Sequence, residues 1–372
     1  MDGLKKISNV FAFTILVGML LLASGCTGVE TGKIVFTSRL EGTNDNYIYS
    51  MNLDGSNKVK LARCAPFHAE PFQMWSADGK MLAFIDYDSE TDKSWLCVVD
   101  ADGENKRRLL EMTVFRSYTM SLTPDGRTIV LSHDVSRTIE TPQGGTVHVT
   151  VTNDSDLFTV DVATGVVKQL TDTPDVWESY PSISPDGKKV SFVVRIDTEN
   201  KKGIPEYIFI MDVYGGNRRE LAYHSEGLSL LAFQGLHWSP DSKKVAYSVF
   251  NYSISDYEHF SDIFVIDVEE GECNNLTESP YIVDEGISWS PDSRKIAYYS
   301  GAYSWIMDAD GKNKFKLIQS GPSSWTPDGH GLVSVSPLNV YEIIVIDANG
   351  ENLRSLVKIE GLRISNPMWL SD

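Results

Sequence analysis

Hydrophobic residues after position 32 occur in short runs rich in β-branched and aromatic side chains, such as Ile263-Phe-Val-Ile266 and Lys295-Ile-Ala-Tyr-Tyr299. Tight-turn sequences separate these runs, and no apolar pattern keeps the period of a helix for long enough to predict one. The run 263–266 is apolar at every position, so both faces of that strand must be covered. The pattern therefore predicts an all-β chain whose sheets pack face to face.

Two kinds of turn recur at fixed places relative to the apolar runs. The first has Ser or Thr, then Pro or Ala, then Asp, then Gly or Ser, at 76–79, 123–126, 184–187, 239–242, 290–293 and 326–329. Proline presets φ at the second position of a type I turn, and Asp and Gly suit the later positions. The second turn follows a strand ending in Asp or Asn, at 51–55, 99–103, 160–165, 211–215, 266–271, 307–311 and 346–350. The two turns mark the ends of hairpins in a repeated unit.

The repeat predicts a seven-bladed β-propeller of four-stranded antiparallel blades over residues 33–372. The run Lys33-Ile-Val-Phe-Thr37 lacks an inner strand before it, and Asn366-Pro-Met-Trp369 is an inner strand with nothing after it. We expect the N- and C-terminal strands to pair and close the ring, because this removes an open sheet edge. Trp75, Trp238, Trp289, Trp325 and Trp369 recur before the first turn, which favours packing between blades over a carbohydrate platform.

The repeated pattern W-S-P-D-G-x-x-[IV]-A-[FY], followed by [IV]-[FY]-[IV]-M-D-x-D-G, resembles the TolB-type propeller family across nearly all of residues 33–372. The resemblance implies the fold and leaves the activity open. TolB itself is similar only in its propeller, since no α/β domain precedes the repeats here. Relatives in the prolyl peptidase group attach a hydrolase to such a propeller, but this sequence contains no G-x-S-x-G nucleophile elbow.

The first residues resemble an export signal. Lys5 and Lys6 precede an apolar run from Val10 to Ala23, shorter than the roughly 20 residues of a membrane-spanning helix. The segment Leu22-Ala-Ser-Gly-Cys26 resembles a bacterial lipobox, although Ala23 stands where that pattern prefers a branched aliphatic residue. We predict a signal peptide at 1–25, lipidation of Cys26 and a short tether at 26–32. The alternative is an ordinary secretory signal with an incidental cysteine.

Composition narrows the class of partner. The chain has 51 acidic and 33 basic residues among 372, giving a formal charge of -18, so phosphate repulsion argues against a nucleic-acid partner. With Cys26 lipidated, acyl chains rather than charge hold the protein on a membrane. We expect an exported, membrane-anchored lipoprotein, periplasmic or on the cell surface, and monomeric.

The two ends of the predicted propeller differ. One end carries only the tight turns, whereas the other carries every insertion, among them 38–46, 86–93, 133–156, 195–206 and 251–262. Long loops on a rigid scaffold commonly carry recognition. The insertion Thr138–Thr150 alternates around Gly144-Gly145 and predicts an extra hairpin projecting from a blade, either a contact arm or a flap without a partner. Basic residues on outer strands, such as Arg218 and Arg219, are interpreted as edge protection.

A candidate ligand face lies where the blades approach the central channel. It comprises His68, Glu70, Arg116, Tyr118, Glu178, Tyr180, Gln234, His237 and Glu285. Histidines with carboxylates could bind a divalent cation or act in acid–base chemistry, as in some propeller lyases, and Arg116 is the candidate for contacting an anion. The alternative is that each is a separate solvated loop residue. No catalytic residue and no cofactor other than such a cation is predicted.

These observations favour a protein- or peptide-binding module at the cell envelope over an enzyme. The alternative function is a metal-assisted lyase or hydrolase that acts on a polysaccharide at the central channel. Cys64, Cys97 and Cys273 remain after lipidation of Cys26, so at least one thiol is unpaired in a monomer, and their pairing stays open. Cys97 lies in a predicted strand core and is interpreted as a small buried hydrophobe.

Overall fold

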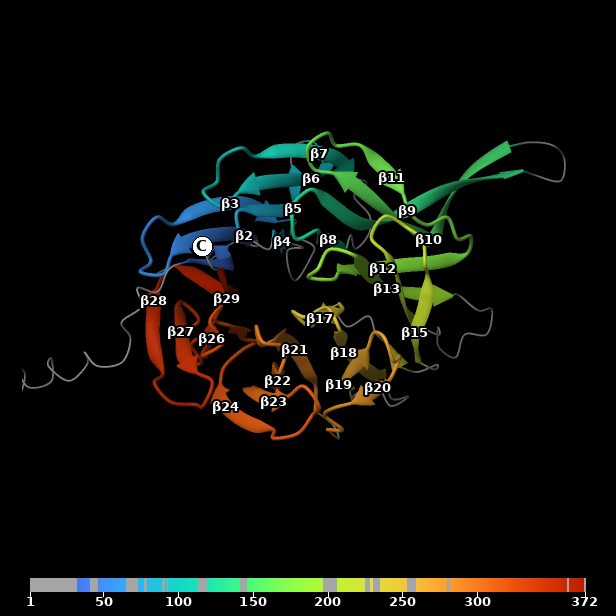
Figure 1. The fold of residues 1–372 in the computed structure, drawn as a ribbon. Helices are drawn as coiled ribbons and strands as arrows, with labels where there is room; N and C mark the ends of the chain where they lie inside the picture. Colours follow the sequence, from blue (N-terminus) through green and yellow to red (C-terminus); the bar gives the residue numbers. More distant parts are fainter. Residues whose placement is uncertain are drawn as a thin grey trace, which may run out of the picture. The chain divides into compact units, whose positions relative to one another are not determined.

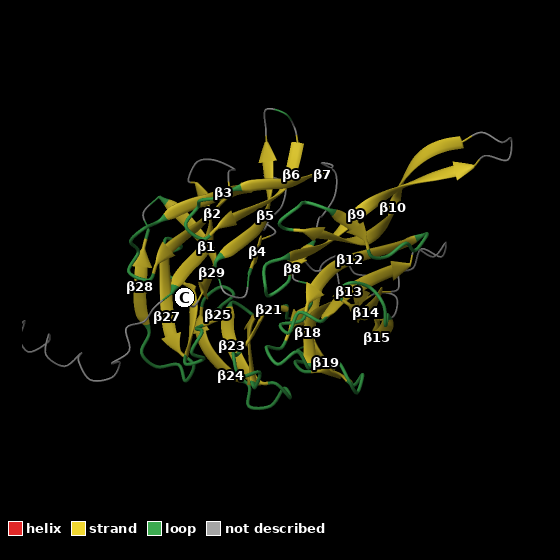
Figure 2. Ribbon diagram, turned by 45° about the horizontal axis from the view of Figure 1, so that its top comes forward, coloured by secondary structure: helices red, strands yellow, loops and turns green. Residues whose placement is uncertain are grey.

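The computed structural model describes residues 32–40, 46–64, 73–76, 79–88, 91, 93–112, 119–140, 146–196, 206–224, 228–229, 235–252, 259–279, 282–359 and 361–370. All of them belong to one compact unit, Gly32–Asp372. They form strands joined by turns, with no helix among them (Figure 2). The predicted signal peptide, Cys26 and the tether lie outside the described residues.

Most strands of the first half of the chain pair antiparallel with a strand next to them in sequence, and they range in length from 3 to 16 residues. Their bounds are β1 Lys33–Leu40, β2 Asn46–Asn52, β3 Val59–Cys64, β4 Gln73–Trp75, β5 Met81–Asp88, β6 Lys93–Asp100, β7 Arg107–Met112, β8 Met120–Leu122, β9 Thr128–Glu140, β10 Thr146–Asp161, β11 Val167–Gln169, β12 Val176–Ile183, β13 Lys189–Ile196, β14 Glu206–Asp212 and β15 Arg219–His224.

The second half repeats the same arrangement. Its strands are β16 Leu228–Ser229, β17 His237–Trp238, β18 Lys244–Tyr252, β19 His259–Asp267, β20 Cys273–Asn275, β21 Asp284–Trp289, β22 Lys295–Ser300, β23 Tyr303–Asp308, β24 Phe315–Gln319, β25 Ser324–Trp325, β26 Gly331–Val335, β27 Glu342–Asp347, β28 Arg354–Lys358 and β29 Leu362–Leu370.

The sheets of this unit follow one another around a ring, as in a β-propeller (Figure 1). The prediction of seven separate four-stranded blades is wrong. The described residues form five blade-sized sheets, four of them with four strands and one with five, and a sixth sheet of eight strands, β8–β15. One parallel bridge, Ser155 to Trp177, joins β10 to β12 within that sheet. The matching residues Ser261 and Val283 form only an isolated bridge, so sheets there stay separate.

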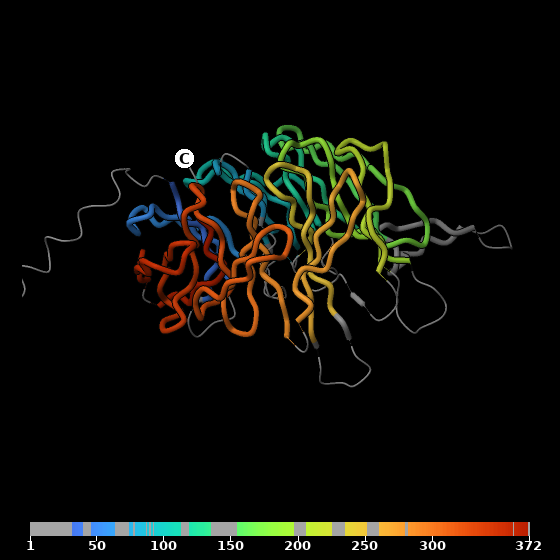
Figure 3. The backbone as a smooth tube through the Cα atoms, turned by 60° about the horizontal axis from the view of Figure 1, so that its bottom comes forward, coloured from blue at the N-terminus to red at the C-terminus, as the bar shows by residue number. Residues whose placement is uncertain are grey.

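The two ends of the ring pair as predicted. β29 is antiparallel to β1, with Ile34 opposite Trp369 and Arg39 opposite Arg363, and the sheet order is β29-β1-β2-β3. In the backbone trace the blue start and the red end of the unit lie beside each other (Figure 3). Gly32 has φ +128°, and a Cβ there would lie 2.2 Å from the Leu370 carbonyl oxygen, so the approach of the two ends requires glycine.

The hydrophobic core lies between neighbouring sheets. Ile263 and Val265 of β19, for example, pack with Ile287, Trp289 and Ile296 of the next sheet, and all five are buried. Strands that are apolar on both faces therefore bury both, as the run 263–266 predicted. This arrangement makes each sheet depend on its neighbours for its core.

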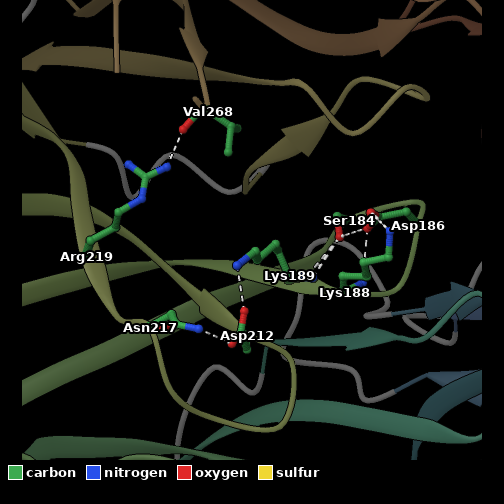
Figure 4. Close-up of polar contacts among 8 residues, drawn as sticks. All are labelled: Ser184, Asp186, Lys188, Lys189, Asp212, Asn217, Arg219 and Val268. Atoms are coloured by element: carbon green, nitrogen blue, oxygen red, sulfur yellow. Dashed lines mark hydrogen bonds and ion pairs between the residues drawn. The ribbon is translucent and has the colours of Figure 1, made fainter. Parts of the chain in front are cut away.

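Both predicted turns are hydrogen bonded in a similar way around the ring. In Figure 4 the Ser184 hydroxyl donates to Asp186 Oδ1 at 2.6 Å, while the Lys189 ammonium contacts Asp212 Oδ1 at 2.6 Å. The Arg219 guanidinium donates to the carbonyl oxygen of Val268 in the next sheet. Equivalent pairs join Lys244 to Asp267 at 3.2 Å and Lys295 to Asp308 at 2.8 Å.

The recurring tryptophans join neighbouring inner strands. The indole Nε1 of Trp238 donates to the Ser182 carbonyl oxygen at 2.9 Å, and that of Trp289 donates to the His237 carbonyl oxygen at 3.0 Å. Trp325 makes the same bond to Ser288 at 3.0 Å. For these three tryptophans the predicted role in packing between sheets is confirmed.

The predicted extra hairpin is confirmed in its backbone. β9 and β10 stay paired from Thr128–Asp161 out to Glu140–Thr146, with an irregularity between Thr150 and Ser155. Their outer halves project from the ring (Figure 1, Figure 2). Among the described residues, β8 pairs with β9 only at Ile129–Leu131, and β12 pairs with β10 only at Ser155. The outer parts of β9 and β10 therefore pair with each other and have no further strand at either edge. We call the paired residues 136–140 and 146–150 the arm.

Candidate functional site

The predicted ligand face is described in part. His68, Glu70, Arg116, Tyr118 and Gln234 lie outside the described residues. Glu178 and Tyr180 lie on β12, His237 on β17 and Glu285 on β21, which are inner strands of successive parts of the ring. Glu178 is fully buried and the other three are half-buried, so these four residues lie on strands and not in solvated loops.

Glu178 belongs to a buried charged group. The Arg218 guanidinium contacts Glu178 Oε1 at 2.7 Å and also donates to the Thr173 hydroxyl at 3.2 Å. Thr173 in turn donates to Glu178 Oε1 at 3.3 Å, whereas Oε2 has no hydrogen-bond partner. Burial raises the pKa of Glu178, and the Thr171 hydroxyl and Arg218 act in the opposite direction. The arrangement holds one carboxylate out of water against one guanidinium.

A second buried carboxyl, Asp284, occupies the equivalent position at the start of β21. Its side chain is fully buried, and neither carboxylate oxygen has a hydrogen-bond partner. The main chain is fixed, because Asp284 N donates to the Ser261 hydroxyl at 2.9 Å and that hydroxyl donates to the Asp284 carbonyl at 2.8 Å. Burial raises the pKa of Asp284, and the Ser300, Ser279 and Thr277 side chains act in the opposite direction.

Each buried carboxyl has a second carboxylate near it: Asp156 lies near Glu178, and Asp262 lies near Asp284. Asp156 accepts from Gln169 at 2.8 Å and from the Thr173 amide at 3.2 Å. Asp262 accepts from Asn275 at 2.9 Å and from the Ser279 amide at 2.8 Å. The hydrogen bonds are the same in both copies because Ser155-Asp-Leu-Phe158 and Ser261-Asp-Ile-Phe264 begin equivalent stretches of sequence.

The ligand face predicted from the sequence includes Glu178 but not Asp284, Asp262 or Asp156. It includes Glu285, the neighbour of Asp284, although the spacing to the following Ser-Pro-Asp turn matches Glu178 with Asp284. That spacing was the available signal. Arg218, interpreted as edge protection, instead pairs with Glu178, and its guanidinium lies 4.8 Å from the Phe209 ring centroid.

Tyr180 has an unusual backbone conformation. Its φ is 52°, a region in which bulky residues are strained, whereas Gly286 and Asn366 hold the equivalent place with φ of 68° and 47°. The Tyr180 amide donates to the Thr119 hydroxyl at 2.7 Å, and its ring packs against the core around Leu236. The residue is thus fixed by packing, at an irregularity of the β12–β13 register.

A chain of polar side chains joins His224, Tyr247 and Cys273. His224 Nε2 lies 2.9 Å from the Tyr247 hydroxyl, which lies 3.1 Å from Cys273 Sγ. His224 is 7% exposed, and its ring also meets Phe264 edge-on at 5.4 Å. Burial lowers the pKa of His224, because an imidazolium would lose its hydration among these rings.

We predict that His224 makes the protein less stable as the pH falls below about 6.5, the ordinary pKa of histidine. There the unfolded state binds a proton that the folded state excludes, so stability falls by at most about 1.4 kcal/mol per pH unit from this group. His224→Phe keeps the ring packing and removes the proton. Urea unfolding from pH 8 to 5 should show a shallower loss of stability in the variant. Parallel curves for the two proteins would contradict this assignment.

Among the described residues no three His, Cys, Asp or Glu side chains gather into a metal site. No described segment forms a helix with the length and apolarity needed to cross a bilayer. Cys97 is a buried free thiol, as predicted, and burial raises its pKa to about 12, whereas Cys273 is an exposed free thiol. The side chain of Cys64 lies outside the described part of the chain.

The sequence is similar to one enzyme over part of its length. It is 26% identical to the oligogalacturonate lyase of Dickeya dadantii over 163 residues, which are 41% of this chain and 41% of the lyase. The match thus spans less than half the length of either protein. No family model matches the chain.

The fold of most of the chain is similar to that of solved structures. TolB from Acinetobacter baumannii superposes with a TM-score of 0.50 and 16% identity, covering 92% of this chain and 67% of that one. An oligogalacturonate lyase in complex with manganese superposes with a TM-score of 0.54 and 16% identity, covering 82% of each chain. At this identity the likeness concerns the fold, and it supports an all-β propeller for this chain.

Proposed function

We propose that this chain is an exported, lipid-anchored propeller that binds another protein or a peptide at the cell envelope. The observation that carries the proposal is the arm, a two-stranded ribbon that extends β9 and β10 beyond the ring. Unpaired ribbon edges offer backbone N–H and C=O groups to an added strand, a common mode of peptide recognition. The predicted lipobox at Cys26 supports the location, and the acidic charge of -18 suits a basic partner.

Shortening the arm tests this proposal. Replacing residues 137–149 by Asn-Gly joins Ser136 to Thr150, which are opposite each other, through a two-residue hairpin turn. We expect the variant to keep the melting temperature of the parent, because the arm lies outside the packed sheets. It should lose at least tenfold in affinity for a partner captured from envelope extract, measured by titration of the purified pair.

Photo-crosslinking locates the contact. A crosslinkable residue at Thr138 or His148 of the arm should capture the partner, whereas one at Val166, 64% exposed in a tight turn, should not. Equal capture at Val166, or full binding by the shortened chain, would overturn the role of the arm. These results are independent of lipidation, which mass spectrometry of the membrane form tests separately at Cys26.

The second candidate is a metal-assisted lyase or hydrolase acting on a polysaccharide at the central channel. The similarity to the oligogalacturonate lyases favours it. If it holds, protein incubated with oligogalacturonate and Mn²⁺ should release unsaturated products with a new ultraviolet absorbance, and a chelator should stop the release. Substitution His237→Ala or Glu285→Ala should then reduce the rate without changing the melting temperature. A protein inert with Mn²⁺ on acidic and neutral glycans would eliminate this candidate.

A further inference from the structure

The carboxyl of Asp284 is fully buried, and no cationic side chain among the described residues forms an ion pair with it. Both of its oxygens are buried and lack a hydrogen-bond partner. An ionised carboxylate in that state is strongly unfavourable unless a positive charge or several donors compensate it. The side chain cannot easily leave, because Ser261 holds the Asp284 amide and carbonyl, and the Ser248 hydroxyl also donates to that carbonyl at 3.1 Å.

The equivalent site in the earlier repeat has a cation beside its buried carboxyl. There the Arg218 guanidinium lies 2.7 Å from Glu178 Oε1. Lys314 takes the place of Arg218 in the later repeat, since Gly215-Gly-Asn-Arg218 matches Gly311-Lys-Asn-Lys314. The Lys314 ammonium instead donates to the Thr277 carbonyl at 3.2 Å. Aspartate is also one methylene shorter than glutamate, so the carboxyl of Asp284 reaches less far toward the outer strand.

Three hydroxyl groups lie near the Asp284 carboxyl. The hydroxyls of Ser300, Ser279 and Thr277 lie near enough to lower its pKa, although none makes a hydrogen bond of normal geometry, and the charge of Asp262 raises it. Carboxylates with hydroxyl and carbonyl oxygens form the donor set that Ca²⁺ prefers, in a geometry that tolerates irregular sites. Mg²⁺ demands a stricter octahedron and keeps several waters.

We propose that the Asp284 carboxylate binds one Ca²⁺ ion, which takes the place that the Arg218 guanidinium holds beside Glu178. The ion joins β19 to β21, because Asp262 lies on the first strand and Asp284 on the second. This role is structural and independent of the proposed envelope function. The site contains two carboxylates, so it differs from the candidate ligand face of histidines and carboxylates predicted at the channel.

Thermal melting of the full-length protein tests the proposal. After removal of cations with a chelator, adding Ca²⁺ should raise the melting temperature by about 3 °C or more, and Mg²⁺ should do so less. Asp284→Asn should abolish the shift. The matched control Glu178→Gln should keep it, because that site has its own cation in Arg218.

A variant with a built-in cation provides the second test. Asp284→Glu combined with Lys314→Arg recreates the pair of the earlier repeat, so its melting temperature should no longer respond to Ca²⁺. Tb³⁺ bound in place of Ca²⁺ should show luminescence sensitised by Tyr298 and Trp305, whose rings stack at 6.3 Å in this sheet. Ca²⁺ should compete for that signal.

Two outcomes would overturn the proposal. A melting temperature of the parent protein that is equal in chelator and in Ca²⁺ would mean that a proton, not a cation, neutralises Asp284. A Ca²⁺ shift retained by the double variant would place the ion elsewhere. If Asp284→Asn does not fold, the double variant and the Tb³⁺ competition still decide.

Discussion

Removing β29 is expected to abolish cooperative unfolding. A chain that ends at Ile359 lacks the strand that pairs with β1 and loses the buried side chains of Leu362 and Ile364, together with Trp369 from the same core cluster. Each buried apolar side chain contributes about 1.5–3 kcal/mol, so Leu362 and Ile364 alone account for about 3–6 kcal/mol, a large part of the total stability of many domains. The exposed edge of β1 adds a risk of aggregation.

Circular dichroism against temperature is the measurement. A control chain that ends at Leu370 keeps the whole of β29 and should melt like the parent. A synthetic peptide of residues 361–372, added in trans, should restore a cooperative transition to the truncated chain. If the truncated chain melts at the parent temperature without the peptide, the pairing of β1 with β29 does not close the ring in solution.

Replacing Arg218 by methionine is expected to cost about 3 kcal/mol, because it leaves Glu178 buried without its cation. Methionine keeps the contact of the side-chain stem with the neighbouring rings. Glu178→Gln should cost less, since Arg218 is 30% exposed in its side chain and can reach water. The double variant should be more stable than Arg218→Met alone, because it leaves no unpaired buried charge.

Urea unfolding of the parent, the two single variants and the double variant measures how strongly Arg218 and Glu178 depend on each other for stability. Arg127→Met is the matched control, because the Arg127–Asp125 pair is exposed and spans 3.9 Å, so its loss should change stability by less than about 0.5 kcal/mol. The penalty in Arg218→Met should shrink at lower pH, where Glu178 becomes protonated. A double variant as unstable as the sum of the single changes would show that the pair is not coupled.

Much of the fold was predictable because its signals are local. The Ser-Pro-Asp-Gly and Asp-x-x-Gly turns depend on φ preferences and on side chains within a few residues, and the Ser184 turn forms as predicted. The unmatched half-blades at Lys33 and Trp369 predicted the pairing of β1 with β29. The number of sheets was wrong, because the single bridge between Ser155 and Trp177, which joins β10 to β12, has no sequence signature.

The candidate site was predictable only in part. The predicted ligand face contains the buried Glu178, but at the equivalent place it contains Glu285 instead of the buried Asp284, and in a strand neighbouring residues point to opposite faces. An irregularity of register between Glu285 and Ser288 further obscures which residue faces inward. The pairing of Arg218 with Glu178 joins residues of different strands, which no local pattern reveals.

The sequence by itself determined the repeat, the turns, the strand composition and the closure of the ring, because each follows from residues close together in the chain or from the period with which they recur. Only the tertiary structure decided which strands merge into one sheet and which buried carboxylate receives a positive charge. Those outcomes depend on distances between strands that are remote in sequence, where one methylene or one hydrogen bond changes the partner. Glu178 and Asp284 occupy the same place in two repeats, yet only Glu178 meets a guanidinium.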